Sequence, residues 1–219
     1  SVSFALDGFQ VTAVEPDPST TIGAGAINSL KQQFRLDKLT VVQAWGESLP
    51  LESASFDVCY IRQAMHHAHK LDSFIKEAAR LIKPGGILFT LRDHVIYDAK
   101  DKEWFLQSHP LHKFYGGENA FTESEYDAAI ANAGLVIEEK LYHYDSVINY
   151  FPEKKSVVEG KREKRESLIA ASWQNRIPKF LRGVDSLKNW YYNRAEAKLG
   201  PVFNDSKIPG RHIAYVARK

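Results

Sequence analysis

Short apolar runs alternate with amphipathic segments along the first 145 residues, and this alternation determines the predicted fold. Runs rich in β-branched and aromatic residues, each bounded by turn residues, predict buried strands at 11–15, 39–45, 56–63, 87–93, 135–145 and 212–219. Helical periodicity predicts helices at 25–34, 72–83 and 123–133. We expect the KPGG sequence at 83–86 to end the second helix, because proline and glycine do not continue a helix.

The third helix carries signals at both ends. Thr122 and Glu125 have the spacing of a capping box, in which each side chain satisfies a backbone donor of the other residue. Gly134 follows the last periodic residue and predicts the end of this helix. Alternating strands and helices predict an α/β fold with a mostly parallel sheet covered on both faces, which binds ligands at the carboxyl ends of its strands.

A helical, charge-rich insertion is expected at 152–209, between the last two strands of a single domain that spans 1–219. Across 151–199 there are twelve Lys or Arg and six Asp or Glu, and the simplest interpretation of the charges is a solvated helix face. The second half of the insertion mixes basic residues with Trp173, Phe180 and Trp190. A lid over the pocket is the favoured role for it, and a homodimer contact or a membrane-surface patch are the alternatives.

Composition narrows the class of protein. The chain has 219 residues, 44% hydrophobic and 26% charged, as in ordinary globular domains, and its net charge of +2 is too small to indicate nucleic acid as a partner. Cys59 is the one cysteine, which excludes an intrachain disulfide. There is no apolar run of the roughly 20 residues that a membrane span needs, and no signal peptide pattern. We therefore expect a soluble, cytoplasmic protein without a transmembrane segment.

Three motifs carry a family resemblance. The sequences VEPDPS, AWGESLPLESASFDVCYIRQAMHHAH and FIKEAARLIKPGGILFTLRDH, in this order, resemble the class I S-adenosylmethionine-dependent methyltransferases over about residues 1–145, with the last strand at 211–218. The stretch RDHVIYDAKDKEWFLQSHPLHKFYGGENAFTESEY resembles a bacterial branch of the family often found beside glycan-modifying enzymes. The resemblance implies a Rossmann-like sheet with an antiparallel last strand, and S-adenosylmethionine as cofactor.

The family places its glycine-rich cofactor loop after the first strand and an acid at the end of the second. Here the strand at 11–15 ends in the acid Glu15, and the ten residues before it are typical of the end of a helix. The GAG sequence at 23–25 follows the acid and does not replace the loop. The resemblance therefore implies that the first strand and its loop precede Ser1, and that this chain is truncated at its N-terminus.

The resemblance also assigns cofactor contacts. Glu15 would accept both ribose hydroxyls, with a cap of the following turn as the alternative, and Asp17 is either a second acid for the cofactor or a helix cap. Family members usually carry an acid-then-small pair after the third strand to contact adenine, whereas this chain has Trp45, Gly46 and Glu47. We expect Trp45 either to stack on adenine or to pack in the core, and Glu47 to take over the polar contact.

Two further cofactor contacts are expected where the strand at 56–63 ends. Arg62 and Gln63 lie where the family approaches the methionine part of the cofactor, and a salt bridge is the alternative role for Arg62.

Methyl transfer to oxygen needs a base, and His94 at the end of the LRDH strand is the predicted one, oriented by Asp93. The alternative for His94 is a solvent-facing side chain beside an Arg92–Asp93 pair. The HHAH sequence at 66–69 does not have the spacing of a tetrahedral metal site, so no metal is predicted. Hydrogen-bonding groups beside an aromatic ring suit a sugar-like substrate, and the residues predicted to bind it are His67, His109, His112, Tyr115, Glu118 and Asn119.

The sequence thus predicts methyl transfer from S-adenosylmethionine to an oxygen of a glycan or another small polar acceptor, with a phosphorylated or lipid-linked molecule compatible with the basic insertion. Two alternatives stay open. One is a non-catalytic, methyltransferase-like binding or assembly module. The other is a nicotinamide-dependent Rossmann oxidoreductase, against which the KPGG sequence argues.

Overall fold

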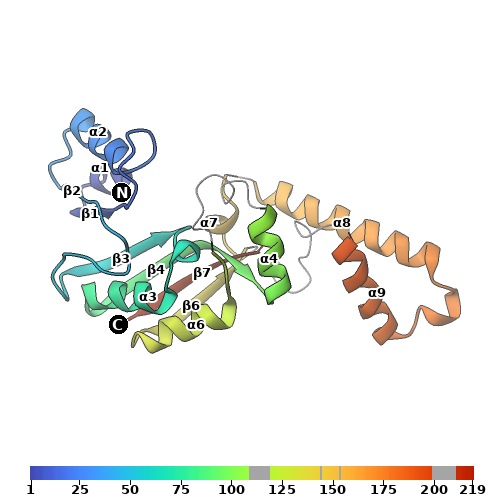
Figure 1. The fold of residues 1–219 in the computed structure, drawn as a ribbon. Coiled ribbons are helices and arrows are strands. Elements are labelled where there is room, and N and C mark those ends of the chain that lie inside the picture. Colours follow the sequence, from blue (N-terminus) through green and yellow to red (C-terminus); the bar gives the residue numbers. More distant parts are fainter. Residues whose placement is uncertain (109–118, 144, 153, 199–210) are drawn as a thin grey trace.

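The computed structural model describes residues 1–108, 119–143, 145–152, 154–198 and 211–219, in which strands and helices alternate as predicted. The strands fall into two hydrogen-bonded sheets (Figure 1). The smaller sheet pairs β1 (Val11–Val14) in parallel with β2 (Leu39–Val42). Together with α1 (Val2–Leu6) and α2 (Ala24–Phe34) it forms an N-terminal unit that has its own small core of Ala5, Ala13, Leu36 and Leu39.

The larger sheet has the order β3-β4-β7-β6, with the two-residue strand β5 paired to the end of β4. Its strands β3 and β4 are parallel, and β7 is antiparallel to both β4 and β6, which confirms the predicted direction of the last strand. The bounds of these strands are Phe56–Arg62 for β3, Ile82–Ile96 for β4, Phe121–Thr122 for β5, Val136–Tyr142 for β6 and His212–Arg218 for β7. Within the described residues no ladder joins β1 to β3, whereas the sequence predicted one sheet.

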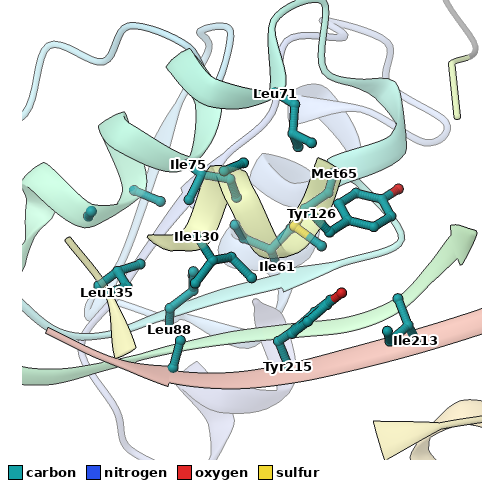
Figure 2. Packing of buried hydrophobic residues seen from close by; sticks show 14 of the residues in the cluster. Ile61, Met65, Leu71, Ile75, Leu88, Tyr126, Ile130, Leu135, Ile213 and Tyr215 are labelled. Carbon is teal, nitrogen blue, oxygen red and sulfur yellow. The ribbon is translucent and has the colours of Figure 1, made fainter. Parts of the chain in front are cut away.

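The main core lies between the larger sheet and two helices, α3 (Leu71–Leu81) and α6 (Glu123–Asn132), which pack beside each other. Figure 2 shows Ile75 and Ile130 of these helices meeting Leu88 and Tyr215 of the sheet, all four fully buried. Complete burial of a side chain of this size stabilises the fold by about 1.5–3 kcal/mol. This cluster therefore holds the strand ends in fixed positions.

The opposite face of the larger sheet is more open near β3. Val58 and Tyr60 are 48% and 43% exposed, and Phe4 of α1 packs edge-on against Tyr60. The helical cover expected on both faces is therefore thin at this edge strand.

The capping box of α6 is confirmed, since Thr122 Oγ1 accepts the backbone N–H of Glu125 and the Glu125 carboxylate accepts that of Thr122. Gly134 follows the helix with a φ of 78°, a left-handed conformation that glycine adopts without steric cost. The predicted end of the helix near the KPGG sequence is confirmed, since α3 ends at Leu81. The predicted start of the next strand at residue 87 is wrong, because residues 83–86 belong to β4, which is 15 residues long and pairs irregularly with β3 there.

Helices make up most of the remainder. A helix that sequence reasoning missed, α4 (Ala99–Ser108), packs against β4, and α7 (Val147–Tyr150) follows β6. The predicted insertion contains α8 (Lys155–Arg176), the short η2 (Lys179–Leu181) and α9 (Asp185–Lys198), and Figure 1 shows α8 and α9 extending away from the larger sheet. The assignment of 1–219 to one domain stays a prediction. None of the described helices combines the length and apolar character needed to cross a membrane.

Candidate active site

The carboxyl ends of β3 and β4 meet at one edge of the larger sheet, where the backbone turns sharply. Gln63 follows β3 with a φ of 51° and donates its N–H to Leu91 O at 2.9 Å. The chain then forms the 3-10 turn η1 (Met65–His67). In β4, Arg92 has a φ of 60°, and the pairing with β7 shifts register between Thr90 and Asp93. Such an irregularity changes the direction of the following side chains, and these are Asp93 and His94.

Asp93 is fully buried and pairs with His66, for which no catalytic role was predicted. Its Oδ1 lies 3.1 Å from His66 Nδ1 and accepts the backbone N–H of His66 at 3.3 Å. Oδ2 is buried and has no hydrogen-bond partner among the described residues. Burial raises the pKa of Asp93 to about 7. The backbone N–H groups of residues 64–66 stabilise the charged carboxylate and act in the opposite direction, but their effect is smaller. The carboxylate thus bonds to His66, and the orientation of His94 by Asp93 stays a prediction.

Histidine rings from four different elements follow one another along this edge. The centroid of His66 lies 4.1 Å from that of His67 and 5.0 Å from that of His94. His94 lies 4.9 Å from His212, and His212 lies 5.1 Å from His143. We call His66, His94, His143 and His212 the histidine row. These rings come from η1, β4, the residue after β6 and the start of β7.

His212 is neutral at physiological pH. Burial, and then electrostatic repulsion from the directions of His94, His143 and Arg92, lower the pKa of His212 to about 3. Its Nδ1 lies 3.1 Å from His143 Nδ1 and 3.3 Å from Asn149 O. Two ring nitrogens at this distance share one proton, so the tautomers of His143 and His212 are coupled.

Fixed neighbours hold the row in place. Tyr126 donates its hydroxyl to His94 O at 2.9 Å, and the ring of the buried Phe105 lies 5.1 Å from that of His94. Arg211 forms a buried bidentate pair with Asp101 of α4, at 2.8 and 2.7 Å. Because Arg211 directly precedes His212, this pair attaches the start of β7 to α4.

Glu15 and Asp17, the acids predicted to bind the cofactor, both organise the loop after β1. Glu15 Oε1 accepts the N–H of Asp17 at 3.0 Å, which is the turn-capping alternative. Within the described residues the other carboxylate oxygen of Glu15 has no hydrogen-bond partner. Asp17 accepts both the N–H and the hydroxyl of Ser19, at 2.8 and 3.0 Å, so it supports the loop that leads into α2.

The loop after β2 contacts the loop after β3. Trp45 is 61% exposed, which excludes the core-packing alternative, and its ring lies edge-on to His69 at 5.1 Å. Glu47 accepts the N–H of His69 at 2.9 Å. A Cβ on Gly46 would come within 2.2 Å of the Phe74 ring, so glycine allows this loop to lie against α3. These contacts bring Trp45, Gly46 and Glu47 to the sheet edge that holds the histidine row.

The other predicted residues are placed unevenly. Arg62 is exposed. The pKa of Arg92 is lowered mainly by burial and, to a smaller extent, by the positive charge of Arg62. His67 is exposed beside His66, and Asn119 donates to Ala68 O at 3.3 Å. His109, His112, Tyr115 and Glu118 lie outside the described residues. Among the described side chains no group of three or more His, Cys, Asp or Glu could hold a metal ion.

The donor set fits S-adenosylmethionine at the edge formed by the loops after β1 and β2. The free carboxylate oxygen of Glu15 can accept a ribose hydroxyl, and the exposed Trp45 ring offers a flat apolar surface for adenine. Sequence reasoning missed His143 and His212. A signal for His212 existed, because the first residue of an antiparallel strand lies at the same edge as the carboxyl ends of its parallel neighbours.

Comparisons with known proteins agree with this arrangement. Residues 1–90 match the family described as "Methyltransferase domain". The chain is 31% identical over 106 residues to a sterol 4-C-methyltransferase of Caenorhabditis elegans, covering 48% of this chain and 32% of that protein. It is 33% identical over 93 residues to the ubiquinone/menaquinone biosynthesis C-methyltransferase of Rhizobium rhizogenes, covering 41% and 36%. The chain spans about a third of the length of these curated relatives.

Solved structures share the fold. The [4+2]-cyclase SpnF superposes with a TM-score of 0.60 at 16% identity, covering all of this chain and 69% of that one. A geranyl diphosphate C-methyltransferase from Streptomyces coelicolor, crystallised with S-adenosyl-L-homocysteine, has a TM-score of 0.60 at 14% identity, covering 99% and 64%. The predicted Rossmann-like α/β class is thereby confirmed. Residues 1–90 match the methyltransferase domain family, and the predicted resemblance to the class I S-adenosylmethionine-dependent methyltransferases is confirmed.

Proposed function

We propose that this domain transfers a methyl group from S-adenosylmethionine to an oxygen of a small polar acceptor, such as a glycan. The observation that carries the proposal is the buried Asp93–His66 pair in contact with His94, at the sheet edge where the loop after β2 also lies. A titratable acid and a row of imidazoles at a ligand-binding edge are suited to removing a proton from an acceptor.

The cofactor supplies a methyl group on a sulfonium, which already has a good leaving group. The chain's residues therefore have to bind the cofactor, align the acceptor with the methyl group and exclude water from the site. Glu15 accepts a ribose hydroxyl through its free oxygen, and Trp45 covers adenine. Arg62 and Gln63 approach the methionine part, as the resemblance implies. Glu47 and Asp17 support the two loops instead of contacting the cofactor directly.

His94 takes the acceptor proton. Its ring lies between those of His66 and His212, and Tyr126 and Phe105 limit its movement. His212 is neutral at physiological pH because its pKa is about 3, so it adds no positive charge that would oppose protonation of His94. Asp93 acts on His66, and through that ring it positions His94.

The identity of the acceptor rests on weaker support. A glycan acceptor is supported by the polar residues predicted to bind a sugar, which are His67, His109, His112, Tyr115, Glu118 and Asn119. Four of them, His109, His112, Tyr115 and Glu118, lie outside the described residues, so their support comes from the sequence alone. The similar proteins named above are a sterol 4-C-methyltransferase and a ubiquinone/menaquinone biosynthesis C-methyltransferase, and a structure of similar fold is a geranyl diphosphate C-methyltransferase. A base is also needed for an activated carbon acceptor, so the histidine row is compatible with both chemistries. Cytoplasmic location, a homodimer and a phosphorylated or lipid-linked acceptor stay predictions.

A second candidate is a non-catalytic module with the same fold. The observation that favours it is the absence of a ladder between β1 and β3 in the described residues, because Glu15 and the histidine row then belong to separate sheets. The family match argues against the third candidate, a nicotinamide-dependent oxidoreductase.

Calorimetric titration with S-adenosylhomocysteine tests the proposal. We expect micromolar binding, weakened by about 1.5–3 kcal/mol in Glu15→Ala, the scale of a hydrogen bond to a charged group. Glu52→Ala removes an exposed carboxylate from a neighbouring loop and should bind like the unchanged protein. Equal affinity of both variants would remove Glu15 from the cofactor site. Absence of binding would favour the non-catalytic module.

Transfer of a labelled methyl group then distinguishes the acceptors. Sugars and other hydroxyl compounds form one panel, and quinone precursors, sterols and prenyl diphosphates form the other. Labelling confined to the second panel would overturn the oxygen acceptor while leaving the cofactor assignment intact.

A further inference from the structure

The α8–α9 hairpin is built as a defined unit. Trp173 of α8 is buried against the rings of Tyr191 and Tyr192 of α9, with centroids 5.2 and 6.3 Å away. Ser172 Oγ and Tyr191 Oη lie 2.6 Å apart, which adds a polar link between the helices. Arg182 in the connection donates to the carbonyl of Ile177 at 2.8 Å and to that of Gln174. The turn is therefore fixed onto the end of α8.

Large apolar side chains nevertheless point outward on this hairpin. Phe180 in the turn is 82% exposed, and Trp190 and Leu168 are 54% and 56% exposed. The hairpin extends away from the larger sheet in Figure 1, so within the described structure the sheet does not cover its end. Several exposed apolar groups on one element indicate a surface that contacts another phase or molecule.

The same surface is basic. Residues 168–194 contain five Lys or Arg and one acid, Asp185. A groove of about 350 Å³ lies between the two helices and is lined by Arg176 and Arg194, with Leu168, Ile169 and Trp190 beside them. Among the described side chains neither Arg176 nor Arg194 has an acidic partner, and the guanidinium of Arg194 lies over the Trp190 ring at 5.4 Å. Cationic and apolar groups therefore share one groove.

We propose that the α8–α9 hairpin docks on the surface of an anionic phospholipid bilayer. Aromatic side chains insert at the level of the head groups, while guanidinium groups bind lipid phosphates, so Phe180 and Trp190 provide the first contact and Arg176 and Arg194 the second. A second copy of this chain is disfavoured on this surface, since two surfaces of the same positive sign repel. Nucleic acid matches the charge but leaves the exposed Phe180 in water. The inference is independent of the proposed reaction.

Vesicle co-sedimentation tests the proposal. The full chain should bind vesicles of phosphatidylcholine with about one third phosphatidylglycerol much more strongly than vesicles of phosphatidylcholine alone. The variant Arg176→Gln/Arg194→Gln should lose about thirtyfold in partitioning, because each basic side chain near an anionic leaflet contributes about fivefold. Phe180→Ser should weaken binding to anionic vesicles without changing its salt dependence.

The matched control is Lys76→Gln/Lys100→Gln, which removes two exposed charges of α3 and α4. An equal loss in this control would mean that net charge alone drives binding and would overturn the proposal, as would equal partitioning to both kinds of vesicle. Tighter binding to single-stranded RNA than to vesicles, or a dimer in light scattering that the arginine variant disrupts, would assign the groove to another partner. Circular dichroism of each variant verifies that the hairpin remains folded.

Discussion

Replacing Asp93 by Asn should change how stability depends on pH. The pKa of Asp93 is about 7 in the folded protein, whereas an exposed Asp in the unfolded chain has the ordinary pKa of about 3.8. The folded state therefore holds a proton between these two values that the unfolded state has released. A group with a raised folded pKa contributes stability below its unfolded pKa and loses it as pH rises through the folded pKa.

The size of the effect follows from the shift. Each pH unit between 5 and 7 removes about 1.4 kcal/mol from the free energy of unfolding, and the loss ends near pH 7. Between pH 5 and pH 8 this carboxyl group therefore lowers stability by about 3 kcal/mol. The amide in Asp93→Asn does not titrate, and its oxygen can still accept the N–H groups of His66. Between pH 5 and pH 8 the variant should not lose this stability, so its free energy of unfolding relative to that of the unchanged protein should rise with pH.

Urea unfolding of both proteins at pH 5, 6, 7 and 8 measures the difference. Asp57→Asn is the control, because Asp57 is exposed, its pKa is lowered by Lys83, and it stays charged over the whole range. Parallel stability curves for Asp93→Asn and the unchanged protein would refute the reasoning. That outcome would mean that Asp93 remains ionised in the folded state, held by its pair with His66.

Three further changes test the site and its support. His94→Ala should reduce turnover by about 10²–10⁴-fold with little change in the affinity for S-adenosylhomocysteine, and unchanged single-turnover rates would exclude His94 as the base. Arg211→Gln leaves Asp101 charged and buried, so thermal unfolding should show a loss of about 3–5 kcal/mol in the free energy of unfolding. The double variant with Asp101→Asn should largely recover this stability, and no recovery would exclude the ion pair as the cause. Thr122→Ala removes the cap of α6 and should cost about 1 kcal/mol in urea unfolding, and a null result would mean that tertiary packing alone fixes the start of the helix.

Elements whose signals are local were predicted well from the sequence. The capping box at Thr122 and the stop at Gly134 depend on backbone groups within a few residues, and both ends of α6 were found as expected. The apolar period of 72–83 likewise predicted α3 to within two residues. The length of β4 was not predictable in this way. Its first residues pair irregularly with β3 despite the KPGG sequence, because strand contacts outweighed the local preference for a turn.

The site depended on contacts that sequence spacing does not contain. Asp93 and His94 are neighbours, which suggested that one orients the other, yet the register shift in β4 directs the carboxylate to His66, 27 residues earlier. His143 and His212 are 69 residues apart and meet because β6 and β7 are antiparallel. The capping alternatives for Glu15 and Asp17 could be predicted from the sequence, since the turn that both acids organise is local, whereas their contacts with the cofactor stay predictions.

The position of β7 also bears on how the chain becomes a folded protein during synthesis. This strand lies between β4 and β6, so β6 has no hydrogen-bonded neighbour in the described sheet until residues 212–218 have left the ribosome. Until then β4 and β6 each present an unpaired edge, and the ion pair between Asp101 and Arg211 cannot form. Contacts of such long sequence separation slow folding and expose strands that can pair with other chains. The nascent protein should therefore depend on chaperones during the interval in which β6 has emerged and residues 212–218 have not.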